Sequence, residues 1–136
     1  MRHGVKSYSF SGGSDANKML LKKLIVNFLE KGALTTTETK AKFTKSRLEK
    51  LIEKAKVRNE ANKNFLLKTV SRSKTIEYLF NEVGPAVKNI RGGYVKIIKM
   101  GHRSSDGAQS AKIVWAHPIV KEEMEKKPVK AKEIQP

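Results

Sequence analysis

The chain of 136 residues contains no cysteine. This absence excludes disulfide frameworks, iron–sulfur clusters and thiolate zinc sites. No run of about 18 apolar residues occurs either, so we expect no membrane-spanning helix. The first residues lack the apolar segment of a secretory signal; they have the serines and the low acid content of a transit peptide, but too little arginine for one.

Acidic residues are scarce: Lys and Arg number 29 against 13 Asp and Glu, so the formal net charge is +16. Residues 121–136 hold five lysines and four glutamates, and the rest of the chain therefore carries +15. A compact protein tolerates such self-repulsion most easily when its partner is a polyanion. Nucleic acid is the first candidate partner, and an anionic membrane surface is the second.

Side chains for acid–base or metal chemistry are also few. The chain has three histidines, and its only aspartates are Asp15 and Asp106. His102 and Asp106 share one predicted loop, but an Asp followed by Gly is typical of a turn. No phosphate-binding glycine motif occurs. We therefore predict no catalytic activity, metal or cofactor, and the alternative from this class is an RNA-modifying enzyme that uses His102 and Asp106.

Three segments have the apolar spacing of amphipathic helices, and a fourth, over residues 59–70, is less regular. The first should begin with Asp15 as its cap and end at Gly32. Thr35 and Glu38 have the spacing of a capping box and predict the start of the second helix. The apolar stripes of these two helices are Leu21, Leu24, Ile25 and Phe28, and Ala41, Thr44, Leu48, Leu51, Ile52 and Ala55.

A third helix is expected over residues 59–70, and a fourth runs from Ser73 to Gly84 and Pro85, a pair that commonly ends a helix. The runs 94–100 and 111–115 are then rich in β-branched and aromatic residues, which predicts an antiparallel hairpin. A two-stranded ribbon is marginal in water, so the helices should pack on one of its faces, with 33–36 as a candidate added strand.

The predicted fold class is therefore α+β, with about four helices packed on a small, largely antiparallel sheet built around a C-terminal hairpin. The predicted organisation is an extended basic arm over 1–14, a single α+β domain over 15–120 that binds a polyanion, and a disordered Lys/Glu/Pro tail over 121–136.

Lysines and arginines gather into separate patches. One flank of the second helix carries cations without an acid, while Glu49 and Glu53 lie on the opposite flank, and neither the arm nor residues 88–99 contain an acid. An ordinary surface mixes both signs and carries a net charge of only about 2 to 8. We predict phosphate contacts in the arm, on the second helix and around the hairpin, with a glycine pair that either lets backbone approach RNA or only shapes a turn. The candidates are Arg2, His3 and Lys6; Lys40, Arg47, Lys50 and Lys54; and Arg91, Gly92, Gly93, Lys96, Lys99 and Arg103.

Aromatic residues give a weaker signal for nucleic acid. Tyr8, Phe10 and Tyr94 have basic neighbours and are candidates for stacking on bases. Phe28, Phe80 and Trp115 lie on apolar stripes and are expected in the core. Neither an RNP-like aromatic pattern nor a zinc-finger spacing is present.

The run from Leu79 to Pro85, Leu-Phe-Asn-Glu-Val-Gly-Pro, and the run from Arg91 to Lys99, Arg-Gly-Gly-Tyr-Val-Lys-Ile-Ile-Lys, resemble a known family. Together with the opening Met-Arg-His and the Thr-Thr pair at 36–37, they are similar to the bacterial ribosomal large-subunit protein seventeen family over about residues 1–120. The family's usual Arg-x-Gly-Asp becomes Arg-Ser-Ser-Asp at 103–106, so the hairpin turn is expected to differ. Ala-Asn at 16–17 stands where the family has His-Arg.

The resemblance implies a structural component of the large ribosomal subunit, in the ribosome and the cytoplasm. It would bind large-subunit rRNA near the outer end of the peptide exit tunnel, beside neighbouring large-subunit ribosomal proteins, and whether the free protein forms a homodimer is left open. Composition and spacing alone predict only an α+β polyanion binder. The main alternative is a nucleoid-type architectural protein on duplex DNA, which would usually need an apolar wedge that the sequence does not show.

Overall fold

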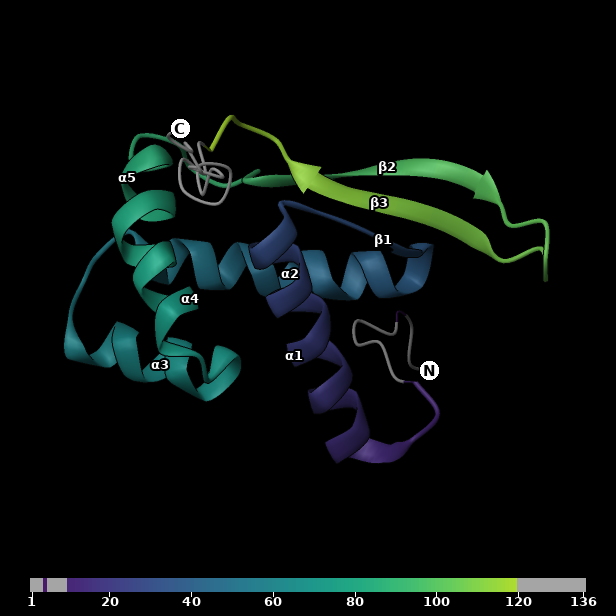
Figure 1. The fold of residues 1–136 in the computed structure, drawn as a ribbon, viewed down its shortest axis with the longest axis horizontal. Coiled ribbons are helices and arrows are strands. Elements are labelled where there is room, and N and C mark those ends of the chain that lie inside the picture. Colours follow the sequence, from purple (N-terminus) through teal and green to yellow (C-terminus); the bar gives the residue numbers. More distant parts are fainter. Residues whose placement is uncertain (1–3, 5–9, 120–136) are drawn as a thin grey trace, which may run out of the picture.

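A computed structural model describes residue 4 and residues 10–119 of the chain. Helices lie on one side of a three-stranded sheet (Figure 1), and the predicted α+β fold is confirmed. The elements in chain order are α1 (Gly13–Lys31), β1 (Ala33–Thr37), α2 (Glu38–Ala55), α3 (Glu60–Val70), α4 (Ser73–Tyr78), a π-helical segment (Leu79–Val83), α5 (Gly84–Ala86), β2 (Val95–His102) and β3 (Gln109–Trp115).

The sheet has the order β1-β3-β2, and both strand pairs are antiparallel. The predicted hairpin is therefore confirmed, and the candidate added strand is β1, which pairs with β3. Leu34, Ile113 and Ile97 lie opposite one another and face the helices. Because side chains alternate between the two faces of a strand, the neighbouring residues of all three strands face away from the helices.

The core lies between the sheet and the helices, and α2 runs along the inner face of the sheet (Figure 1). All the apolar stripe residues predicted for the first two helices are buried. In the fourth helical stretch, Ile76, Leu79, Phe80 and Val83 are buried as well. Burial of these stripes is the main source of stability in a domain of this size.

The predicted starts of the first two helices are wrong. The first helix begins at Gly13 after Gly12, and no side chain caps it, so Asp15 lies in its first turn, where a carboxylate still interacts favourably with the helix dipole. Thr35 cannot open a capping box because it lies in β1, opposite Lys112. The expected end at Gly32 is confirmed, since Gly32 is left-handed with φ of 80° and its N–H donates to the carbonyl of Phe28 at 2.7 Å.

The prediction that Gly84 and Pro85 end the fourth helix is also wrong. The chain stays helical through Ala86, because a π-helical turn lets the N–H of Gly84 bond to the carbonyl of Leu79. Such a wider turn accommodates a proline, which has no N–H to donate. A Cβ at Gly84 would lie 2.5 Å from the carbonyl oxygen of Ala55. Glycine therefore lets this helix approach the end of α2.

The third helix is confirmed over Glu60–Val70. Asn59 caps it, because its side-chain oxygen accepts a hydrogen bond of 2.8 Å from the N–H of Asn62. None of the helices in the described part of the chain has the length and apolar character needed to cross a bilayer.

Candidate nucleic-acid interface

Helix α2 has two flanks of opposite character. We call Lys40, Arg47, Lys50 and Lys54 the cationic flank, and Glu38, Glu49 and Glu53 the acidic flank. Arg47, Lys50 and Lys54 are exposed, and Lys40 is half-buried. Within residues 10–119, none of these four cations forms an ion pair. The cationic flank is thus a strip of uncompensated positive charge.

Glu49 uses its carboxylate to hold the start of β2. One carboxylate oxygen accepts the N–H of Tyr94 and the other accepts the N–H of Val95, each at 3.2 Å. Both residues are buried, and buried backbone N–H groups need partners. Glu49 therefore supplies the acceptors for two consecutive backbone N–H groups where β2 begins.

Glu53 continues the same contact one turn later. It accepts a hydrogen bond from the hydroxyl of Tyr94, whose side chain is buried. Lys56 lies over the Tyr94 ring with its Nζ 4.8 Å from the ring centroid, and it donates to the carbonyl of Ile90. The hydrogen bond from Tyr94, with a further one from Lys56, lowers the pKa of Glu53 below 4.5. Contact with Tyr94, and secondly with Glu53, raises the pKa of Lys56 above 10.5.

Burial of Tyr94 corrects one expectation, because its ring cannot stack on bases while it fills the space between α2 and β2. Phe10 is also engaged, since its ring meets that of Phe43 edge-on with the centroids 5.3 Å apart. Phe43 lies on α2 between Lys40 and Arg47 in the sequence, so Phe10 lies beside the cationic flank.

Glu38, the remaining member of the acidic flank, binds two lysines. Its carboxylate lies 3.2 Å from Nζ of Lys42 and 3.6 Å from Nζ of Lys99 on β2. The hydrogen bond from Lys42, and then the charge of Lys99, lower the pKa of Glu38 below 4.5. Every acid of α2 thus forms a hydrogen bond or an ion pair with a nearby lysine, with Tyr94 or with β2.

The structure divides the predicted hairpin patch. Lys96 faces away from the helices, whereas Lys99 faces them and reaches Glu38, because the two positions have opposite parity in the strand. Arg91 is exposed in the loop before β2, together with Gly92 and Gly93. Both glycines have positive φ, 71° and 63°, so the turn itself requires them.

At the tip of the hairpin, Arg103 is paired with Asp106. Its Nη2 lies 2.7 Å and its Nε 3.1 Å from the two carboxylate oxygens. Asp106 also accepts the N–H of Ala108 at 3.1 Å, and the Arg103 guanidinium lowers the pKa of Asp106 below 3.8. His102 Nδ1 lies 2.8 Å from the carbonyl oxygen of Gly107. The geometry agrees with a turn rather than a catalytic pair at His102 and Asp106.

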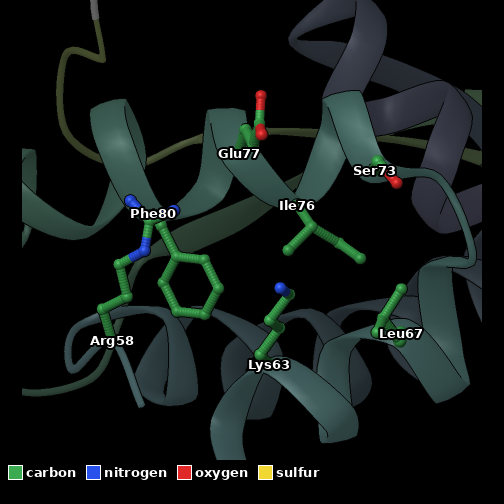
Figure 2. Close-up of a pocket in the computed structure, with 7 residues that line it drawn as sticks. All are labelled: Arg58, Lys63, Leu67, Ser73, Ile76, Glu77 and Phe80. Carbon is green, nitrogen blue, oxygen red and sulfur yellow. The ribbon is translucent and has the colours of Figure 1, made fainter. Parts of the chain in front are cut away.

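A shallow pocket lies between α3 and α4 (Figure 2). Its apolar lining includes Ile76 and Phe80, while the carboxylate of Glu77 points away from it. Arg58 lies beside Phe80, with its guanidinium 5.4 Å from the ring centroid, and donates to Asn81 at 3.1 Å. These side chains do not bring an acid and a base together.

The predicted contacts of the arm, Arg2, His3 and Lys6, lie outside the described residues, as do Tyr8 and the tail over 121–136. One cation that sequence reasoning missed is Lys112, which shares the outward face of the sheet with Lys96. The alternation of side chains along β3 could have predicted which face of the sheet Lys112 lies on. The residues beside Lys112, however, follow only from the register of the strands.

Comparison with known proteins gives a consistent picture. A family model described as Ribosomal protein L17 matches residues 20–115. The chain is 38% identical over 113 residues to the large ribosomal subunit protein bL17 of Gemmatimonas aurantiaca, covering 83% of this chain and 96% of that protein. It is 37% identical over 103 residues to the bL17 protein of Cutibacterium acnes, covering 75% and 58%, and 38% identical over 96 residues to that of Clostridium botulinum, covering 71% and 85%.

Proposed function

The chain belongs to the ribosomal protein L17 family and is a structural protein of the large ribosomal subunit rather than an enzyme; we propose that it binds large-subunit rRNA through separate patches of lysine and arginine. A protein of the large subunit has rRNA and other ribosomal proteins as its partners, and it works in the ribosome, in the cytoplasm. The position near the peptide exit tunnel rests on the family resemblance and stays a prediction, and a homodimer of the free protein stays an open alternative.

The cationic flank of α2 is the observation that carries this proposal. Arg47, Lys50 and Lys54 stand exposed on a rigid helix with no carboxylate paired to them among the described residues. A polyanion gains most from cations that no internal partner neutralises, because binding releases the counterions condensed on its phosphates. The contact between Phe10 and Phe43 places Phe10 beside the same flank, which supports a surface shared by the arm and the helix.

Lysine outnumbers arginine, with 23 of the 29 cations. A lysine ammonium attracts phosphate as a point charge, whereas an arginine guanidinium fits it as a planar fork. The composition therefore supports many moderate phosphate contacts on folded RNA instead of a few that read base edges.

The proposal is tested by measuring the affinity of the full chain for transcribed large-subunit rRNA across a salt series. The variant Arg47→Gln/Lys50→Gln should bind more weakly. The slope of log affinity against log salt is negative, and it should become less steep by roughly 1.4 to 1.8, since each phosphate contact contributes about 0.7 to 0.9. The matched control, Lys68→Gln/Lys74→Gln, removes the same charge from exposed positions on α3 and α4.

Equal losses in the two double variants would mean that net charge, and not the cationic flank, determines binding. Competition with duplex DNA of equal charge separates the alternative function. A preference for the duplex would favour the architectural DNA-binding protein, whereas the proposal requires a preference for rRNA.

A further inference from the structure

The sheet has a second face that no described helix covers. We call Ala33 and Thr35 of β1, Lys112 and Val114 of β3, and Lys96 and Ile98 of β2 the outer sheet face. Thr35, Lys112 and Ile98 lie opposite one another in the register, and Ala33, Val114 and Lys96 form the next row. Helix α2 lies on the other side of the sheet (Figure 1).

The outer sheet face has charge of one sign. The three strands contain no Asp or Glu, so no carboxylate of the sheet itself compensates its lysines. Ile98 is 44% exposed and Met100, at the adjacent bulge, is 56% exposed. This surface thus combines apolar side chains with uncompensated cations, a combination that is unfavourable in water unless a partner covers it.

Lys96 and Lys112 are diagonal neighbours on this face, since Lys96 lies opposite Val114 and Lys112 lies opposite Ile98. Cβ atoms in that relation are about 7 to 8 Å apart, or somewhat less. Long side chains from these two neighbouring positions can bring both ammonium groups to one phosphate, which would relieve the repulsion between the two cations. Thr35, next to Lys112 in the register, adds a further polar side chain to this face.

We infer that the outer sheet face is a second RNA-contacting surface, in which Lys96 and Lys112 bind backbone phosphates and Ile98 and Val114 contact the sugars. This inference rests on the proposed function and adds a surface that is separate from the cationic flank. The acidic flank of α2, with Glu38, Glu49 and Glu53, lies toward β2. These acids separate the cationic flank from the sheet, so we expect the two cationic surfaces to contact two different segments of the RNA.

RNA fits this face better than a protein does. Strand addition at β2 is disfavoured by the bulge between Lys99 and Gly101 and by the lysines along this edge. A stable protein interface needs about 800 Å² on each partner with an apolar, aromatic centre. The outer sheet face has no aromatic residue, and its centre is Lys112.

The absence of cysteine provides a direct test, because Ile98→Cys gives the full chain a single thiol. Its maleimide labelling rate is measured in the free protein, with transcribed large-subunit rRNA, and after RNase treatment of that complex. We expect rRNA to slow labelling at least tenfold and RNase to restore it. Asn64→Cys, exposed on α3, is the control and should keep its rate in the rRNA complex.

Two outcomes would overturn the inference. The thiol could stay reactive in the presence of rRNA, or it could remain protected after RNase treatment of the complex, which would mean that RNA is not what covers it. As a second measurement, Lys96→Gln/Lys112→Gln should make the slope of log affinity against log salt less steep by roughly 1.4 to 1.8. This effect should add to that of Arg47→Gln/Lys50→Gln. If only the α2 variant loses affinity, the inference fails and the proposed function stands; if neither does, the proposed function fails as well.

Discussion

The two flanks of α2 use charge for different purposes. On the acidic flank, carboxylates bond to the backbone of Tyr94 and Val95, to the Tyr94 hydroxyl and to lysines. On the cationic flank, Arg47 and Lys50 have no carboxylate partner among the described residues. One helix thus attaches the sheet with its acids and leaves its cations for an external partner.

Glu49 and Lys50 show the contrast most closely, because they are adjacent in sequence and point about 100° apart on the helix. Glu49 is half-buried against β2, and Lys50 is exposed. Charge on the acidic flank should therefore affect folding, whereas charge on the cationic flank should affect binding.

Glu49→Ala should have the largest effect on folding. It leaves the N–H groups of Tyr94 and Val95 without their acceptor, and losing such partners in a buried setting should lower the free energy of unfolding by roughly 2 kcal/mol. Urea unfolding monitored by circular dichroism measures this loss. Lys50→Ala, the matched control, should change the free energy of unfolding by no more than about 0.5 kcal/mol while weakening rRNA binding. Equal stability of the two variants would contradict the division between the flanks.

Much of the fold could be predicted from local pattern. The stripe of α2 and the hairpin were found because a helix period and a strand period are visible within a few residues. Helix starts were harder: Thr35 has the form of a cap, but pairing with Lys112, which is distant in sequence, places it in β1. The stop at Gly84 failed because a π-helical turn, in which the N–H of Gly84 bonds to the carbonyl of Leu79, carries the helix on to Ala86.

In the candidate site, too, features set by local pattern could be predicted, whereas features set by contacts between elements could not. The cationic flank follows from helical geometry alone, so its exposed residues could be found without a structure. Tyr94 could not be assigned correctly, because its burial depends on packing against other elements, among them α2, whose Glu53 accepts its hydroxyl. The separation of Lys96 from Lys99 was available from strand alternation, whereas the proximity of Lys96 to Lys112 required the register of β2 with β3.

Tyr94→Phe tests the acidic flank with a smaller change. It removes only the hydroxyl that donates to Glu53 and keeps the buried ring in place. Because Glu53 is partly exposed to solvent, we expect a loss of about 1 kcal/mol in the free energy of unfolding. Thermal unfolding should show the decrease, and rRNA affinity of the folded variant should stay unchanged. A weaker affinity at unchanged stability would instead indicate that Tyr94 contributes to binding.

The smallest expected effect concerns the pKa of Glu38, which Lys42 and Lys99 lower to different extents. The lowered pKa means that its ionised form stabilises the folded state fully above pH 4.5, and that this contribution is lost as the pH falls through the folded-state pKa. NMR titration of the Glu38 carboxyl measures that pKa directly. Lys42→Gln should raise it further toward 4.5 than Lys99→Gln, because the hydrogen bond from Lys42 is the larger cause. Both shifts should shrink in high salt. A larger shift from Lys99→Gln would show that β2, and not the neighbouring turn of α2, chiefly holds this carboxylate, and would extend the attachment of the sheet over the whole acidic flank.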